Sequence, residues 1–268
     1  MASLKAGADL AYCFCAEEAA VPIKSYSPEL MVVPVYKSSV FDDKTIDDEE
    51  TERLVKKMVD EVCLAMDKMH VLVLGPGLGR CPFVLEATAR IIQRAQSQFH
   101  LPLVIDADAL FLLTLPKYQN LLTENSNVIL TPNKIELQRL RESNNNLSTL
   151  PQRCLIVEKG AVDIIRPGNN NSSTSKILVC CNEVGGLKRS GGIGDILSGT
   201  MGALVAWNNI MSIREEATDD DLPLSCWTAC CFVKQATKAA FDRYRRSTTA
   251  PDILSELGPS IDRMTSDE

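Results

Sequence analysis

Apolar and polar positions follow one another in blocks that predict a regular succession of strands and helices. Short apolar runs of the kind buried in parallel sheets are bounded by glycine, proline or acidic residues. We expect strands over residues 10–15, 30–35, 71–74, 103–105, 128–130, 155–158, 163–166 and 177–181. The recurrence of such runs along the chain indicates a sheet with many strands.

Stretches with helical periodicity lie between these strands. Residues 43–67 place Leu54, Val55, Met58 and Val62 at the spacing of a one-faced helix. Further helices are predicted over residues 82–98, 134–141, 196–207 and 224–244, with a polar insertion at 212–223 and the last helix closing the fold. Alternating strands and helices predict an α/β fold whose mainly parallel sheet is covered on both faces. Such sheets bind ligands at the carboxyl ends of their strands.

A glycine-rich run follows the strand predicted at 177–181. It spans residues 184–200, carries Lys188 and Arg189, and contains Asp195 as its sole carboxylate. Glycine lets backbone N–H groups converge on an anion, and the start of a helix adds positive partial charge. A carboxylate there repels phosphate, so we expect Asp195 to remove a proton from a substrate hydroxyl as a phosphoryl group arrives. The alternative is a flexible loop in which Asp195 caps the helix.

Two further stretches that follow predicted strands are candidates for ligand contact. Residues 75–79 have the spacing G-x-G-x-G, which is not the dinucleotide fingerprint. Close approach of a ligand to Gly77 and a plain tight turn are equally favoured. Asp106 and Asp108 precede an apolar helical run, where Asp108 is favoured as the helix N-cap. A role near a metal ion or hydroxyl is the alternative.

Asn133 and Glu136 have the spacing of a capping box, with Asn133 as N-cap. Alternatively, Glu136 holds Mg²⁺ through water while Asn133 contacts phosphate or substrate. Lys159 and Gly160 follow a predicted strand and could place a nucleotide, although a surface lysine beside a turn is equally ordinary.

Composition narrows the class of protein. The 268 residues suffice for one large α/β domain, and the net charge of -7 argues against a nucleic-acid partner. The sequence has no run of about 18 apolar residues, so no membrane span is expected. Ten cysteines without a C-x-x-C pair and two histidines argue against a zinc site and for a reduced, intracellular protein.

The motifs are more specific together than singly. Their succession is G-P-G-L-G-R at 75–80, I-D-A-D-A-L at 105–110, L-T-P-N-x-x-E at 130–136, V-E-K-G at 157–160 and G-G-I-G-D-I-L-S-G-T at 191–200. This succession resembles the ATP-dependent NAD(P)H-hydrate dehydratases over nearly the whole chain. The resemblance implies one ribokinase-like domain, a three-layer α/β sandwich over residues 1–268.

An activity is implied as well. The family restores NADH or NADPH from the hydrated cofactor at the expense of ATP: the ring hydroxyl is phosphorylated, and the ring nitrogen then expels phosphate. The resemblance implies Mg²⁺ with ATP, association into homo-oligomers, no nucleic-acid or membrane partner, and a cytoplasmic location, or a mitochondrial one where a targeting segment precedes the chain. Asp195 matches the family's position at the substrate hydroxyl.

The resemblance also carries two sets of contacts onto this chain. Glu136 additionally matches the N-x-x-E motif associated with Mg²⁺. The residues implied at the hydrated cofactor are Gly77, Asn133, Lys134, Ile135, Glu136, Leu137, Gln138, Arg139 and Asp195. Those implied at ATP are Lys159, Gly160, Ala161, Val162, Asp163, Gly185, Gly186, Leu187, Lys188, Arg189, Ser190, Gly191, Gly192, Ile193 and Gly194.

The chain departs from the family pattern at two places. A first strand, a Gly-Gly turn and a Tyr-Thr-Gly-Ala-Pro segment are expected before the helix near Ser3, and the stretch between Arg141 and Leu155 is short. We therefore expect a strand edge left exposed. Two alternatives stay open: a small-molecule kinase that leaves phosphate on its product, and an inactive isoform that binds nucleotide or pairs with full-length subunits.

Overall fold

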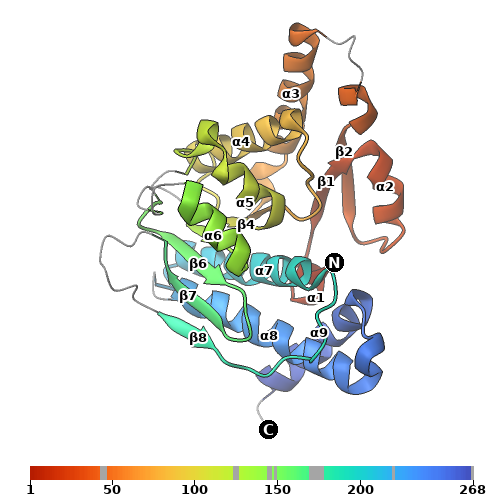
Figure 1. Cartoon of the computed structure of the whole chain (residues 1–268), viewed down its shortest axis with the longest axis vertical. Helices are drawn as coiled ribbons and strands as arrows, with labels where there is room; N and C mark the ends of the chain where they lie inside the picture. Colours follow the sequence, from red (N-terminus) through yellow and green to blue (C-terminus); the bar gives the residue numbers. More distant parts are fainter. Residues whose placement is uncertain are drawn as a thin grey trace.

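A six-stranded sheet forms the centre of the fold (Figure 1). The computed structural model describes residues 1–42, 47–122, 127–143, 147, 150–168, 178–218 and 221–266. The strands follow sequence order across the sheet, and the first four are parallel while the last two pairings are antiparallel. They are β3 (Leu72–Leu74), β4 (Leu103–Ile105), β5 (Val128–Leu130), β6 (Cys154–Glu158), β7 (Asp163–Pro167) and β8 (Val179–Cys181). The prediction of a mainly parallel sheet is therefore confirmed.

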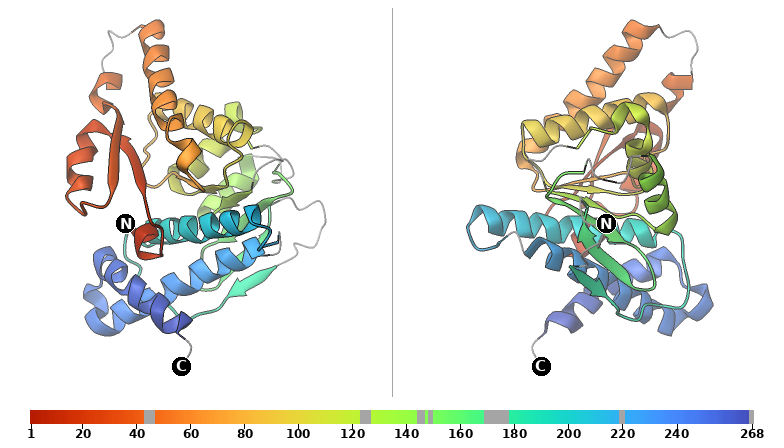
Figure 2. Two further views of the ribbon diagram at one scale, coloured as in Figure 1. Left: turned by 180° about the vertical axis from the view of Figure 1, so that it is seen from behind. Right: turned by 60° about the vertical axis from the view of Figure 1, so that its left-hand side comes forward.

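Helices cover both faces of this sheet (Figure 2). One layer contains α3 (Asp48–Cys63), α4 (Pro82–Ser97), α5 (Ala107–Thr114) and α6 (Lys134–Ser143). The other contains α1 (Ala2–Lys5), α7 (Ile193–Ile213), α8 (Asp221–Tyr244) and α9 (Ala250–Thr265). Short 3₁₀ turns lie at η1 (Ser38–Asp42), η2 (Met66–Lys68), η3 (Pro116–Tyr118) and η4 (Arg245–Ser247). The three-layer α/β sandwich matches the expected architecture.

Side chains of the central strands divide between the two layers. Leu103 and Ile105 of β4 join the core on the α3–α6 side, whereas Val104 joins the core on the other side. All three are 0% exposed. Successive strand residues point to opposite faces, so a strand buried on both must be apolar throughout. This explains why the central strands were recognisable as uninterrupted apolar runs.

β1 (Tyr12–Ala16) and β2 (Met31–Tyr36) form a separate two-stranded parallel sheet, joined by α2 (Glu17–Lys24). In the described part of the chain these strands pair with each other and not with β3, so β3 is an edge strand of the central sheet. All residues of β1 are partly exposed, whereas those of β4 and β5 are fully buried. Phe14, Val35 and Tyr36 pack against the core on the α3–α6 side.

The C-terminal helices differ from the prediction in their number and length. α7 continues to Ile213, and α8 begins at Asp221, inside the predicted polar insertion. The expectation that the helix over 224–244 closes the fold is wrong, because α9 follows it. A capping box between Thr249 and Asp252 starts α9, with a proline in its first turn. Residues 43–46 of the predicted helix at 43–67 and residue 177 of the predicted strand at 177–181 lie outside the described residues.

α7 carries the glycine-rich run into the core. Among the described helices it has the length and apolar composition of a candidate membrane span, but more than half of that stretch is buried. Met201 and Val205 are 0% exposed within the core that includes Val104 and Ile129 of the sheet. α7 is therefore a core helix of this fold.

Candidate functional site

A buried ion pair lies at the carboxyl edge of the central sheet. Asp106 follows β4 and Lys159 follows β6, and Lys159 Nζ lies 2.6 Å from Asp106 Oδ1. The Asp106 side chain is 2% exposed and that of Lys159 is 18% exposed. Parallel strands bring their carboxyl ends to one edge, which explains why residues 53 positions apart meet there.

Asp106 also starts α5, which corrects one prediction. Its Oδ1 accepts a hydrogen bond from Ala107 N at 2.9 Å, and its own backbone is extended at the position where α5 begins. The favoured assignment of Asp108 as the N-cap is therefore wrong. Asp108 lies in the first turn of α5, where its Oδ1 accepts from Arg80 Nε at 3.0 Å. The two carboxylates thus have different partners.

The loop after β3 closes tightly over Asp106. Gly75 has φ +114°, and a Cβ built on it would lie 1.7 Å from the Asp106 carbonyl oxygen. No other residue fits this position without moving one of the strand ends. By contrast, a Cβ on Gly77 would meet nothing within 4 Å, so this part of the loop borders open space. The structure thus leaves room for the ligand contact expected at Gly77.

Asp195 lies beside the buried ion pair, in the first turn of α7. A Cβ built on the preceding Gly194 would lie 3.6 Å from Lys159 Nζ and 3.8 Å from Asp106 Oδ2. The N-cap of α7 is Gly192, and the Asp195 carboxylate makes no hydrogen bond to the described residues. Asp195 therefore is not the helix cap, and its carboxylate is available for another role.

Electrostatics favour a proton-accepting role for Asp195. Partial burial raises the pKa of the Asp195 carboxyl, the nearby Asp106 carboxylate raises it further, and the Lys159 ammonium lowers it. A carboxyl whose pKa is raised is a stronger base than an ordinary aspartate, and perturbed groups of this kind concentrate at functional sites. Asp195, Lys159 and Asp106 together form what we call the Asp195 cluster.

α8 holds together the two segments predicted to contact ATP. Lys234 Nζ donates to Ala161 O at 2.6 Å and lies 3.2 Å from Asp163 Oδ2. One turn later, Thr237 Oγ1 accepts a hydrogen bond from Gly186 N at 3.0 Å. Sequence reasoning missed Lys234 and Thr237, because neither belongs to a motif and the contacts span 51 to 73 positions.

The remainder of the glycine-rich loop is anchored to the start of α9. Lys188 Nζ and Ser190 Oγ both donate to the carbonyl oxygen of Thr248, at 2.6 and 2.8 Å. Thr248 itself is 2% exposed, which makes it a firm anchor. The loop is therefore tied at Gly186 and again at Lys188 and Ser190, while Arg189 is exposed. Such anchoring preorganises a backbone that would otherwise be mobile.

The segment predicted at the hydrated cofactor forms the start of α6. Asn133 Oδ1 accepts from Glu136 N at 3.0 Å, and Glu136 Oε2 accepts from Asn133 N at 2.8 Å, so the predicted capping box is confirmed. The backbone of Asn133 also forms an isolated parallel β-bridge with the backbone of Lys159. Leu137 is 2% exposed in the core, which leaves its side chain unable to meet a ligand. Lys134, Ile135, Gln138 and Arg139 are exposed.

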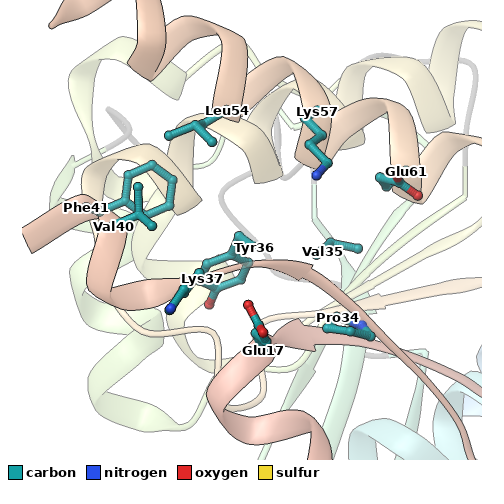
Figure 3. A pocket seen from close by; sticks show the side chains of 10 residues that line it. All are labelled: Glu17, Pro34, Val35, Tyr36, Lys37, Val40, Phe41, Leu54, Lys57 and Glu61. Atoms are coloured by element: carbon teal, nitrogen blue, oxygen red, sulfur yellow. The ribbon is translucent and has the colours of Figure 1, made fainter. Parts of the chain in front are cut away.

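The cavities in the described residues include a smaller one near the Asp195 cluster and a larger one elsewhere. The smaller, about 110 Å³, adjoins the Asp195 cluster through α5 and is lined by Arg80, Ala107, Asp108, Leu110, Phe111, Thr114, Glu136 and Arg139. The larger, about 330 Å³, lies between β2, η1 and α3 (Figure 3). It is lined by Glu17, Pro34, Val35, Tyr36, Lys37, Val40, Phe41, Leu54, Lys57 and Glu61. None of the predicted site residues lines the larger cavity, whereas Glu136 and Arg139 line the smaller one.

Comparison with known sequences identifies the chain's relatives. The family described as NAD(P)H-hydrate dehydratase matches residues 1–259. The mouse ATP-dependent (S)-NAD(P)H-hydrate dehydratase is 36% identical over 280 aligned positions, which cover 98% of this chain and 73% of the mouse protein. The Arabidopsis thaliana protein of the same name is 35% identical, with 98% and 73% covered. That of Schizosaccharomyces pombe is 33% identical, with 100% and 81% covered.

Solved structures share the fold. A hypothetical protein of Streptococcus mutans superposes with a TM-score of 0.65 at 20% identity, covering 99% of this chain and 84% of that one. A ribokinase-like superfamily protein of Enterococcus faecalis superposes with a TM-score of 0.58, also at 20% identity, covering 98% and 80%. The predicted ribokinase-like α/β fold is confirmed.

Proposed function

The chain belongs to the NAD(P)H-hydrate dehydratase family, and on that premise we propose that it restores NADH or NADPH from the hydrated S epimer at the expense of ATP. The observation that carries the proposal is the Asp195 cluster. It combines a carboxylate without a hydrogen bond to the described residues, a lysine held by a buried aspartate, and the N-terminal turn of a helix. These are the groups that transfer of a phosphoryl group to a hydroxyl requires.

In the first step the ring hydroxyl oxygen attacks the γ-phosphorus of ATP. The hydroxyl proton passes to the Asp195 carboxylate, the bond between the γ-phosphorus and the β–γ bridging oxygen breaks, and ADP departs. Charge that develops on the transferring phosphoryl group is stabilised by the Lys159 ammonium and by the backbone N–H groups at the start of α7. Asp106 holds Lys159 in place through their ion pair.

In the second step the phosphorylated ring eliminates phosphate. The lone pair of the ring nitrogen forms a double bond to the adjacent carbon, the carbon–oxygen bond breaks, and phosphate leaves. Loss of a proton from the neighbouring carbon restores the dihydronicotinamide ring. Phosphate is a far better leaving group than hydroxide, which explains why ATP is required.

The residues present fit a magnesium ion that arrives with the triphosphate. The described residues contain no group of three or more histidine, cysteine or carboxylate side chains able to enclose a metal ion. Mg²⁺ at nucleotide sites keeps several waters and takes one or two carboxylates with the phosphates. Glu136 is suited to contact such an ion through water, because only its Oε2 is engaged by the capping box. When bound, the ion would neutralise phosphate charge.

A turnover assay of the purified chain tests the proposal. With hydrated NADH, ATP and Mg²⁺, we expect recovery of the NADH absorbance together with equimolar ADP and free phosphate. Asp195→Asn removes the proton acceptor and should lower kcat by about two to four orders of magnitude while ATP binding is retained. Asp48→Asn, which changes an exposed aspartate in the first turn of α3, is the matched control and should behave as wild type.

Other outcomes would contradict the proposal in recognisable ways. A phosphorylated organic product without recovered NADH would identify a small-molecule kinase. ATP binding by a folded protein without any turnover would identify an inactive isoform. Wild-type turnover by Asp195→Asn would remove Asp195 from the mechanism while leaving the overall activity in place.

A further inference from the structure

The small cavity beside the Asp195 cluster is lined by two guanidinium groups. We call it the Arg80 pocket; its volume is about 110 Å³, and its lining comes from the loop after β3, from α5 and from α6. Two arginines and two carboxylates, Arg80, Arg139, Asp108 and Glu136, line it together with apolar residues of α5. The contacts of each side chain decide which of the guanidinium N–H groups are available to a ligand.

Arg80 is held in one orientation by two contacts. Its guanidinium carbon lies 4.2 Å from the centre of the Phe111 ring, and its Nε donates to Asp108 Oδ1 at 3.0 Å. The other Asp108 oxygen accepts from Gly79 N at 3.1 Å, which fixes the carboxylate in turn. These contacts engage the face of the guanidinium and its Nε and leave the two terminal Nη groups for other partners. They make no hydrogen bond to the described residues.

The formal charges of the pocket cancel, because two arginines face two carboxylates, but internal contacts do not use all of the guanidinium N–H groups. Asp108 is engaged by Arg80 and Gly79, and Glu136 Oε2 is engaged by Asn133 N at 2.8 Å. The Arg139 guanidinium, from α6, makes no hydrogen bond or ion pair within the described part of the chain. The pocket therefore presents one anchored and one unengaged guanidinium. Arginine forks bind phosphate oxygens in pairs, so the ligand chemistry they suit is a phosphate or diphosphate.

The position of the pocket relates it to the dinucleotide rather than to ATP. Ala107 and Asp108 line it from the first turn of α5, directly after Asp106 of the Asp195 cluster. Glu136 and Arg139 belong to the segment expected at the hydrated cofactor, whereas residues 159–163 and 185–194 contribute nothing to the lining. A ligand whose ring lies at Asp195 would reach this pocket with the groups attached to its ribose.

We propose that the Arg80 pocket binds the diphosphate bridge of the hydrated dinucleotide, with Arg80 as the contacting residue and Asp108 as its positioning residue. This inference rests on the proposed function. Arg139 supplies the second cation. The pocket thereby selects dinucleotides over smaller hydrated nicotinamides that lack the bridge.

Binding of ADP-ribose and turnover of hydrated NADH test the inference together. ADP-ribose carries the same diphosphate bridge without the reacting ring, so its affinity reports the pocket independently of catalysis. Arg80→Ala should raise both the Kd of ADP-ribose and the KM for hydrated NADH by about tenfold or more, with the KM for ATP unchanged. Arg80→Lys keeps the charge but loses the planar fork and the Nε anchor, and should recover part of the loss.

Arg94→Ala is the matched control, because Arg94 pairs with Asp60 on the surface between α3 and α4, outside the pocket, and its removal changes the net charge equally. It should leave both constants at the wild-type value. Unchanged constants in Arg80→Ala would overturn the inference. A raised KM for ATP alone would also overturn it, because the pocket would then bind the triphosphate of ATP. If Arg80→Ala does not fold, wild-type constants in a folded Arg80→Lys would overturn it equally. Failure of the proposed function is distinct, since the wild-type chain itself would then not restore NADH.

Discussion

At the scale of single residues, the behaviour of Asp195 depends on its two charged neighbours. Burial raises the pKa of its carboxyl most, Asp106 raises it next, and Lys159 opposes both. In the proposed mechanism Asp195 must be ionised to accept a proton, so activity should fall as the pH drops through this raised pKa. The acidic limb of a plot of kcat/KM against pH reports that value in the free enzyme.

Asp106→Asn should move the acidic limb to lower pH. The substitution removes a negative charge that raises the pKa of Asp195, and it leaves the Lys159 ammonium, which lowers that pKa, without its counter-ion. A rate profile measured across the acidic range checks the direction, with Asp60→Asn on the surface of α3 as a control of equal charge. A limb that stays in place or moves to higher pH would show that Asp106 does not act on the Asp195 carboxyl.

At the scale of elements, α8 determines the shape of the glycine-rich loop. A Cβ on Gly186 would lie 2.4 Å from the Thr237 carbonyl oxygen and 2.9 Å from Phe241 Cβ, so Gly186→Ala must displace the loop from the helix. We expect a loss of about 1–3 kcal/mol in the free energy of unfolding. Gly191→Ala meets nothing within 4 Å and should change that free energy by less than about 0.5 kcal/mol. Urea unfolding of the two variants measures the difference; equal stabilities would mean that the loop is not packed against α8.

The elements that could be predicted from sequence are those whose cause is local. Leu103, Val104 and Ile105 are apolar without interruption because both faces of β4 are covered, and the capping box at Asn133 needs only residues three apart. α9 was missed although its signal at Thr249 and Asp252 is equally local.

The remaining part of the site depends on contacts across the fold. Asp106 and Asp108 both precede an apolar helix, and their sequence context alone cannot show which one caps it. The choice is settled by Lys159, 53 positions away, which pairs with Asp106, and by Arg80, which pairs with Asp108. In the sequence Arg80 is an ordinary polar residue after a glycine turn. Its contact with the Phe111 ring becomes visible only in the folded structure.

At the scale of the whole molecule, the site is assembled from the two layers and the sheet between them. The sheet contributes the residues after β4 and β6, one helical layer contributes α5 and α6, and the other contributes α7 (Figure 1). β1 and β2 form a sheet of their own, and their partial exposure contrasts with the fully buried β4 and β5. The Asp195 cluster thus rests on the best-packed part of the fold, which suits a site that must hold its groups in fixed positions.

The most direct test of phosphorylation followed by elimination is to trace the oxygen of the ring hydroxyl. Hydrated NADH labelled with a heavy oxygen isotope at that hydroxyl is converted with ATP and Mg²⁺, and the released phosphate is analysed by mass spectrometry. The proposed mechanism predicts one labelled oxygen in each phosphate, because the carbon–oxygen bond breaks after the oxygen has been phosphorylated. Unlabelled phosphate alongside recovered NADH would contradict the mechanism, since ATP would then have been hydrolysed without phosphorylating the ring.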